Sequence, residues 1–197
     1  MSLIASDYSD RLLESSLEEL NEAHRQLIEL SRLDPLTQAN NRRALMESLE
    51  LELRRSLRYH HPFALLFLDI DHFKEVNDRY GHAFGDKVLQ RIVGVARGQV
   101  RPPDIIGRYG GEEFAIGLVE CSLEGAQRIA ERIRLRIAES SMVWEQNVAS
   151  VTVSIGIAML TPDVDRVETL IDRADKALYE AKAEGRNRVK VFKDASV

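Results

Sequence analysis

The feature that most constrains the fold is a short, strongly apolar segment that ends in acidic residues. Residues 63–68 read FALLFL, and Asp69 and Asp71 follow directly in the sequence DID. An apolar run of this length, bounded by polar segments, is typical of a buried central strand and is far too short to span a membrane. Residues two apart on a strand share a face. We therefore expect two carboxylates on one face at the end of a central strand.

The segments around this strand alternate between helical and strand patterns. Leucines at i+4 steps predict a helix from Arg42 to about Tyr59, capped by Asn40 or Asn41. Further along the chain we expect a polar loop over 72–86, a helix over 87–99, strands over 104–109 and 113–119 joined by a two-residue Gly-Gly hairpin, a helix over 123–140, one long strand over 147–160, a helix over 167–184 closed by Gly185, and a short strand over 189–192. The order β-α-β-β-α-β predicts an α+β fold with a ferredoxin-like core, in which helices flank a central antiparallel sheet.

The N-terminal segment has a different pattern. Residues 7–33 show heptad spacing of apolar side chains, with His24 at a seam position where leucine is missing: Leu13, Leu17, Leu20 and Leu27. This spacing predicts either a two-helix coiled-coil seam or an amphipathic helix packed on its own domain. We expect residues 1–33 to form an N-terminal signalling helix that continues from an upstream sensor, and residues 34–193 to form the main domain.

Composition excludes several classes of protein. The net charge is −5 and the pI is about 5.6, which argues against a nonspecific nucleic-acid binder. The single cysteine, Cys121, permits no intrachain disulfide and fits a buried structural thiol in a reducing compartment. The chain has neither a signal-peptide pattern nor an apolar run long enough to cross a membrane. We expect a cytoplasmic protein whose sequence, as given, makes no membrane contact.

Two adjacent glutamates follow two glycines in RYGGEEF. In a ferredoxin-like sheet this hairpin lies beside the strand that carries Asp69, and at most one of Glu112 and Glu113 shares the Asp69 face if the strand is regular. Carboxylates that meet at one edge repel each other unless a divalent cation neutralises them, and oxygen ligands favour Mg²⁺ or Mn²⁺. The pattern indicates metal-assisted phosphoryl or nucleotidyl transfer. The alternative is that these acids are solvated turn charges.

Polar residues after the apolar strand are suited to a nucleotide. Backbone N–H groups near His72 and Phe73, with Lys74, could hold phosphates, while Gly81 and Gly85 would permit tight turns. Two further side chains carry groups that could bind the guanine edge: Asn77 and Asp86.

Two cations stand near the C-terminus. Lys182 lies in the last turn of a predicted helix, where a cation also suits the helix dipole. Arg186 lies beyond Gly185, so the dipole explains it less well.

Several motifs in the same order resemble those of the GGDEF domains, the diguanylate cyclase family. The match covers about residues 34–192 and includes DPLTQANNRRAL, FLDIDHFKEVNDRYGHAFGD, GGEEF, VTVSIGIA and RADKALYEAKAEGRN. One departure is Gln38-Ala39, where the family commonly has Gly-Leu, and it concerns local turn geometry only. The resemblance implies a nucleotidyl-cyclase-type fold and the condensation of two GTP molecules into cyclic di-GMP, with release of two pyrophosphates.

The resemblance also implies roles at matching positions. Two Mg²⁺ or Mn²⁺ ions would be held by Asp69, the backbone carbonyl of Ile70, Glu112 and Glu113. Glu112 would act as the base, while Glu113 and Lys74 would assist catalysis. The remaining substrate contacts would come from His72, Phe73, Lys74, Asn77, Asp86, Lys182 and Arg186. Each protomer would hold one GTP, so two protomers of a homodimer would have to meet face to face.

A second site is implied by RPPD, which matches the RxxD motif of the family. In members that carry it, cyclic di-GMP binds there and stops turnover. Arg101 and Asp104 would bind the product, with Arg132 in support. Arginine suits this ligand because it can donate two hydrogen bonds to guanine O6 and N7.

Two alternatives follow from the same residues. A catalytically silent receptor could bind cyclic di-GMP or GTP without turnover, although such a receptor has no need of the full acidic set. A cyclase acting on another nucleotide is the second alternative, and Asp86 discriminates against it.

Overall fold

The computed structural model describes residues 32–144 and 147–193. The chain divides after Arg32, and the unit described below begins at Leu33. The helix predicted for residues 7–33, with its two possible seams, lies outside the described residues. The proposed boundaries of the signalling helix and main domain therefore stay predictions.

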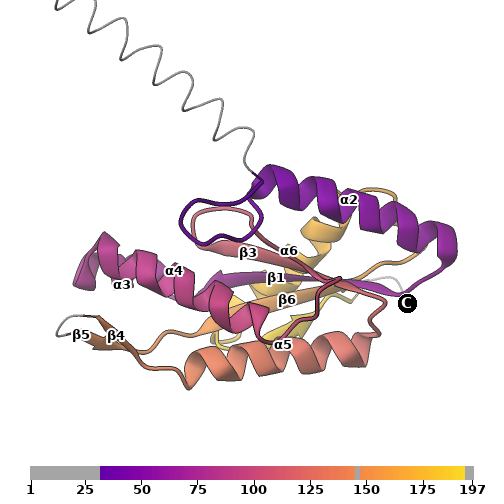
Figure 1. The fold of residues 1–197 in the computed structure, drawn as a ribbon. Helices are drawn as coiled ribbons and strands as arrows, with labels where there is room; N and C mark the ends of the chain where they lie inside the picture. The colour runs from indigo at the N-terminus through magenta and orange to yellow at the C-terminus, as the bar shows by residue number, and fades with distance from the viewer. Residues whose placement is uncertain (1–31, 145–146, 194–197) are drawn as a thin grey trace, which may run out of the picture. The chain divides into compact units, whose positions relative to one another are not determined.

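The described residues form the helices and strands shown in Figure 1. In chain order these are α2 (Arg42–Tyr59), β1 (Phe63–Ile70), α3 (Phe73–Tyr80), α4 (His82–Arg97), β2 (Ile105–Arg108), β3 (Glu113–Val119), α5 (Leu123–Ala138), β4 (Met142–Trp144), β5 (Asn147–Ala149), β6 (Val153–Met159), α6 (Val167–Ala183) and β7 (Val189–Val191). Asn41 caps α2 by accepting a hydrogen bond from the Ala44 N–H at 2.9 Å, which confirms one of the two predicted caps.

The main sheet has the strand order β2-β3-β1-β6-β7. Strand β1 pairs antiparallel with β3 and β6, and only the edge strand β7 runs parallel to its neighbour. Every residue of β1 is buried, as expected for a central strand covered on both faces. The predicted α+β, ferredoxin-like core is therefore confirmed.

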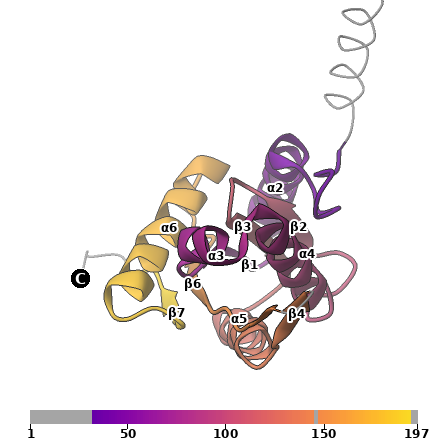
Figure 2. The ribbon, with the colours of Figure 1, turned by 90° about the vertical axis from the view of Figure 1, so that its left-hand side faces the viewer.

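Helices cover both faces of this sheet. The side chains of Leu65 and Phe67 pack with α2 and α6, while Leu66 and Leu68 face α4 and α5. Figure 2 shows α2 and α6 on one side of the strands and α5 on the other. Helix α6 lies so close to β6 that a Cβ atom at Gly156 would be 1.9 Å from the Ala174 carbonyl oxygen. This close packing places the C-terminal turn of α6 beside the end of β1.

The prediction of a polar loop over residues 72–86 is wrong. Residues 73–80 form α3, and α4 begins at His82 rather than at Lys87. Apolar side chains at Phe73, Val76 and Tyr80 pack on the core, a helical spacing that the many charged neighbours obscured. Gly81, with φ of 83°, supplies the predicted tight turn between the two helices. Gly85 instead lies within α4, so the turn predicted there is absent.

The hairpin connection also differs from the prediction. Arg108 pairs with Phe114, so the chain between them is longer than a two-residue turn. Both the Tyr109 and Gly110 N–H groups donate to the Glu113 carbonyl, at 2.9 and 3.3 Å. Neither Gly110 nor Gly111 has a left-handed φ, which a two-residue hairpin of the predicted kind requires. Gly110 is needed for space rather than for backbone twist, because a Cβ atom there would clash with the Glu113 side chain.

The long strand predicted over 147–160 is two strands. Strand β5 pairs with β4 in a separate two-stranded sheet, and β6 enters the main sheet only at Val153. The interruption occurs where Asp71 binds Thr152: the Asp71 N–H donates to the Thr152 carbonyl at 2.9 Å. Alternation of apolar residues alone did not reveal this change of sheet.

Candidate active site

Strand pairing brings two of the predicted acids together. Asp69 lies directly opposite Glu113 in the β1–β3 register, and directly opposite side chains share a face of the sheet. Glu112 precedes the strand and lies in the turn, so alternation does not fix its direction. Burial raises the pKa of Glu112, and the charge of Asp69 raises it further. The site therefore has one strand-held glutamate and one turn-held glutamate.

A lysine contacts this acidic group. Lys182 Nζ lies 2.9 Å from Asp69 Oδ1, and the Asp69 side chain is only 8% exposed. The sequence predicted a phosphate contact for Lys182 but did not predict this ion pair. The pair requires the last turn of α6 to lie over the end of β1, which follows from the close packing of α6 on the sheet.

The three carboxyl groups are electrostatically strained. Burial raises the pKa of Asp69 more than the Lys182 hydrogen bond lowers it, and the nearby Asp71 raises it further. Burial is also the largest cause of the raised pKa of Glu112 and of Glu113, followed in each case by the charge of Asp69. Such a group favours a bound cation, which would stabilise the ionised carboxylates.

The donor set fits a divalent cation that is shared with a substrate. In the described ranges, no three Asp, Glu, His or Cys side chains converge closely enough to hold a metal ion by themselves. Mg²⁺, however, is usually held by one or two carboxylates together with water and substrate phosphates. Asp69, the adjacent Ile70 carbonyl at the end of β1, and the hairpin glutamates provide oxygen donors of this kind.

The hairpin tip is held in place by Arg108. Its guanidinium donates to the carbonyls of Gly110 and Gly111, with Nη2 2.7 Å from the Gly111 oxygen. The same group forms an ion pair with Asp34 at 3.2 Å, close to the start of the domain. The sequence analysis assigned no role to Arg108 or Asp34. The available signal was an arginine two residues before Gly110, close enough to donate to turn carbonyls that need hydrogen-bond donors.

The two hairpin glycines have different surroundings. A Cβ atom at Gly110 would lie 2.5 Å from Glu113 Oε2, whereas one at Gly111 would meet no atom within 4 Å. Gly110 therefore leaves room for the glutamate, and the backbone at Gly111 is open to an approaching ligand.

The predicted phosphate-binding residues lie at the start of α3. His72 has a left-handed φ of 58° and precedes Phe73, the first helical residue. Phe73 is buried in the core, while Lys74 is exposed. The first N–H groups of a helix lack intrahelical acceptors and favour anions. The structure therefore places His72, Phe73 and Lys74 at a suitable end of a helix, although the sequence analysis expected a loop.

The two residues predicted to bind guanine come from different helices. Asn77 lies on α3, and Asp86 is exposed in the first turns of α4. A Cβ atom at Gly85 would be only 1.9 Å from Asn77 Oδ1, so the Asn77 amide lies directly against the residue that precedes Asp86. The structure thus places Asn77 close to the chain segment that carries Asp86. Gly85 makes this approach possible because it has no side chain.

Arg186 lies beyond the end of α6. Gly185 has φ of 113° and follows the helix, as predicted for its C′ position. Arg186 is exposed and its backbone N–H donates to the Ala181 carbonyl at 3.0 Å.

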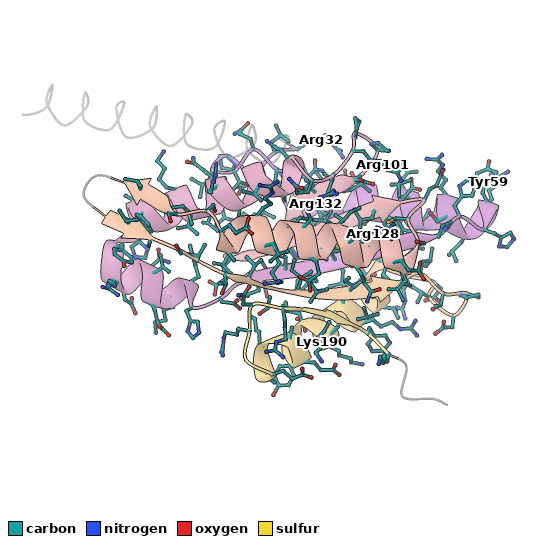
Figure 3. All side chains as sticks on the ribbon, turned by 90° about the horizontal axis from the view of Figure 1, so that it is seen from below. Arg32, Tyr59, Arg101, Arg128, Arg132 and Lys190 are labelled. Atoms are coloured by element: carbon teal, nitrogen blue, oxygen red, sulfur yellow. The ribbon has the colours of Figure 1, made fainter. Side chains whose placement is uncertain are left out.

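A separate cavity lies at the other end of β2 from the hairpin. It has a volume of about 510 Å³ and is lined in part by Arg101, Asp104, Arg128 and Arg132. Figure 3 shows Arg128 and Arg132 on α5 and Arg101 nearby. Arg128 was missed in the sequence analysis, although it lies one helical turn from Arg132 and so shares its face.

Backbone contacts hold the side chains of this cavity. Asp104 is 1% exposed at its side chain and accepts from the N–H groups of Arg101 at 2.9 Å and Val119 at 3.0 Å. The Arg101 guanidinium donates to the Val119 carbonyl, and Arg132 Nη2 donates to the Gln99 carbonyl at 2.6 Å. Cys121 also lines the cavity, and burial raises the pKa of its thiol.

Comparison with known proteins identifies the family. A sequence profile described as "Diguanylate cyclase, GGDEF domain" matches residues 31–188. The chain belongs to the diguanylate cyclase GGDEF-domain family. It is 36% identical over 195 residues to diguanylate cyclase A of Treponema denticola. The matched region covers 96% of this chain but only 52% of that protein.

Solved GGDEF domains share the fold. The GGDEF domain of DgcB from Caulobacter crescentus, solved in complex with c-di-GMP, has a TM-score of 0.79 and 32% identity, covering 83% of this chain and 94% of that one. The active GGEEF domain of a diguanylate cyclase from Vibrio cholerae has a TM-score of 0.74 and 35% identity, covering 79% of this chain and 98% of that one.

The GGDEF domain thus gathers some of its predicted site residues in two places. Those at the end of β1 and on the hairpin are brought together with Lys182, while Arg101, Asp104 and Arg132 share the cavity. Within residues 32–144 and 147–193, no helix combines the length and apolarity needed to cross a membrane.

Proposed function

We propose that this GGDEF domain condenses two GTP molecules into cyclic di-GMP and releases two pyrophosphates. The observation that carries the proposal is the acidic group at the sheet edge: Asp69 lies opposite Glu113, Glu112 directly precedes Glu113 in the turn, and Lys182 contacts Asp69. A receptor that only binds a nucleotide would gain nothing from carboxylates whose pKa values are raised by burial and by mutual repulsion. Such a group supports metal-assisted nucleotidyl transfer instead.

Each residue has a part in the proposed mechanism. Two Mg²⁺ or Mn²⁺ ions would be held by Asp69, the Ile70 carbonyl, Glu112 and Glu113. When bound, they would supply positive charge to the phosphates and lower the pKa of the attacking hydroxyl. Glu112 accepts the proton from the 3′-hydroxyl of one GTP as its oxygen attacks the α-phosphorus of the other. The bond from that phosphorus to the bridging oxygen breaks, and pyrophosphate leaves.

The remaining substrate contacts position the nucleotide. His72 and Phe73 donate backbone N–H groups to the phosphates, Lys74 offsets their developing charge, and Lys182 and Arg186 hold the terminal phosphate. Asn77 and Asp86 bind the guanine edge: a carboxylate accepts from N1–H and N2–H₂, which adenine does not offer as a pair. The close approach of Asn77 to Gly85 supports this assignment.

Because each domain binds one GTP, catalysis requires a homodimer. We propose that the heptad pattern at residues 1–33 pairs two protomers and transmits a signal from an upstream sensor to the domain at 34–193. The protein would work in the cytoplasm, where GTP is available, and would need neither nucleic acid nor a membrane contact of this segment.

The cavity at Arg101, Asp104 and Arg132 is the proposed site of product inhibition. Its arginines suit guanine O6 and N7, and the volume of about 510 Å³ suits a nucleotide. A catalytically silent receptor for cyclic di-GMP is the second candidate function, and the specific observation in its favour is that this cavity has its side chains already held by backbone contacts.

The deciding experiment is incubation of the protein with GTP and Mg²⁺, followed by chromatography for cyclic di-GMP. We expect cyclic di-GMP and pyrophosphate to appear, and ATP to give far less product. The assay is run at protein concentrations where ultracentrifugation shows dimer. Absence of product from such a dimer, with cyclic di-GMP still bound in calorimetry, would replace the enzyme with the receptor. Equal turnover of ATP and GTP would refute the roles of Asn77 and Asp86.

A further inference from the structure

Asp71 has no part in the chemistry proposed above, yet its carboxylate accepts three hydrogen bonds. It is 4% exposed and accepts hydrogen bonds from Thr152 Oγ1 and Ser154 Oγ, each at 2.7 Å, and from the backbone N–H of Asn187 at 3.0 Å. The two hydroxyls come from the start of β6 and the residue before it. The third donor comes from far along the chain, just beyond α6. One buried side chain therefore ties the end of β1 to two distant segments.

The distant segment is the turn formed by Gly185–Arg188, here called the Arg186 turn. Three consecutive residues of this turn have positive φ: Gly185 at 113°, Arg186 at 62° and Asn187 at 46°. Residues other than glycine hold such conformations only where surrounding groups fix them, and they gather at functional sites. The hydrogen bond from Asn187 N–H to Asp71 is a contact that fixes them.

A second side chain holds the same turn from the other direction. Arg134 Nη1 on α5 lies 2.8 Å from Asn187 Oδ1, and the Arg134 side chain is 17% exposed. The Arg188 carbonyl also accepts from the Ile155 N–H of β6 at 3.0 Å. Asn187 is therefore held through its backbone by Asp71 and through its side chain by Arg134, and Arg186 directly precedes it.

Asp71 is also the residue directly before His72. Its backbone leads into the helix start that was assigned to the phosphates, while its side chain holds the Arg186 turn. The two segments that would contact the triphosphate are thereby joined through a single residue. We propose that Asp71, together with Arg134, is a positioning residue that holds Arg186 at the distance from the His72 helix start where it meets the terminal phosphate of GTP.

This inference rests on the proposed role of Arg186, and it has a specific consequence. Loosening the Arg186 turn weakens binding of a nucleoside triphosphate, which reaches Arg186, more than binding of a diphosphate, which does not. A merely structural network would instead affect both nucleotides alike, because the fold they share would be damaged. The ratio of the two affinities therefore distinguishes positioning from stability.

The test measures that ratio by calorimetry with Mg²⁺ and the α,β-methylene analogues of GTP and GDP. The methylene replaces the bridging oxygen at which pyrophosphate would leave, so no turnover disturbs the binding. Arg186→Ala is the reference and should lower the preference for the triphosphate by at least about tenfold, the value of one hydrogen bond to a charged group. Asp71→Ala should lower it similarly, and Arg134→Ala by a smaller factor in the same direction.

Two further variants serve as controls. Asp71→Asn keeps a carbonyl that can accept from Asn187 N–H, so it should retain most of the preference. Arg136→Ala removes the same charge from the same helix as Arg134→Ala, but Arg136 is exposed and lines a separate hollow with Gly98 and Gln99, so the preference should be unchanged. If Asp71→Ala does not fold, Arg134→Ala decides the question alone.

The possible outcomes are distinct. If Arg186→Ala leaves the preference unchanged, the proposed role of Arg186 is wrong and the positioning inference falls with it. If Arg186→Ala abolishes the preference while folded Asp71→Ala and Arg134→Ala keep it, the positioning inference alone is wrong. If Arg136→Ala lowers the triphosphate preference as much as Arg134→Ala does, the Arg134 effect comes from long-range charge and not from its contact with Asn187.

Discussion

The acidic edge and the arginine cavity are built in opposite ways. At the edge, Asp69, Glu112 and Glu113 have raised pKa values because burial and mutual repulsion disfavour their charged forms. In the cavity, Asp104 is almost fully buried but accepts two backbone N–H groups, and Arg101 and Arg132 donate to backbone carbonyls. We expect a cation to complete the first site, whereas the side chains of the second are held by the protein itself.

The difference teaches what each site needs from its ligand. Carboxylates kept in unfavourable contact gain most from a metal ion, so affinity for the metal comes partly from relief of repulsion. Side chains held by hydrogen bonds lose little conformational entropy when they bind a ligand. We therefore expect substitutions at the edge to change chemistry and pH dependence, and substitutions in the cavity to change ligand affinity.

The largest expected effect is at the edge. Glu112→Gln keeps the shape of the side chain but removes its charge and its ability to accept the proton, so turnover of GTP should fall by on the order of 10²–10³-fold or more. The rate of cyclic di-GMP formation and the circular dichroism spectrum measure activity and fold. Glu139→Gln, at the end of α5, is the matched control and should leave the rate unchanged. Retained activity in Glu112→Gln would remove it from the mechanism.

An intermediate effect is expected in the cavity. Arg101→Ala removes a two-pronged donor for guanine, so the affinity for cyclic di-GMP should fall by about 1–3 kcal/mol. Calorimetry with cyclic di-GMP measures this, and Arg136→Ala on α5 is the control. Unchanged affinity in Arg101→Ala would mean that the product binds elsewhere and that the arginine cavity is not its binding site.

The smallest effect concerns pH and stability. A pKa raised in the folded state stabilises the fold at acidic pH, and that contribution is lost as pH rises through the raised value. In metal-free protein at acidic pH, Glu113 is protonated and as neutral as glutamine, so Glu113→Gln should match the wild type. Near neutrality the wild type has lost this contribution because Glu113 ionises at a cost in the folded state, so the variant should be more stable. The gain should stay below about 1 kcal/mol, because Glu113 is only half-buried and water screens its charge.

Thermal unfolding of wild type and variant across this pH range provides the measurement. Saturating Mg²⁺ should reverse the order near neutral pH, because the metal stabilises the ionised carboxylates of the wild type. A difference that is independent of both pH and Mg²⁺ would contradict the picture of a strained acidic group.

Much of the fold was predictable because its signals are local. The apolar run of β1, the cap at Asn41 and the helix end at Gly185 each depend on residues that are close in sequence. The ferredoxin-like order then placed the hairpin beside Asp69. Helix α3 was missed because its short apolar face lies among charged residues, and the turn at Gly110 was misjudged because sequence does not reveal the space that Glu113 occupies.

The site was predictable in its members but less so in its contacts. The family resemblance supplied the residues that would bind metal, nucleotide and product. The ion pair between Lys182 and Asp69, the support of the hairpin by Arg108 and the network at Asp71 join segments far apart in the chain. Such contacts depend on how α6 and the hairpin pack against β1, which no local pattern encodes.

The position of β1 has a consequence for amide hydrogen exchange. Its backbone is paired on both sides, with β3 and with β6, up to and including Asp69. Amides of such a strand exchange only when the whole domain opens, whereas those of a turn exchange through small local openings. We therefore expect the backbone amides around Asp69 to exchange much more slowly than those around Glu112. A deuterium-labelling experiment should find one carboxylate on the slowest-labelling segment of the domain and the other on a neighbouring segment that labels quickly.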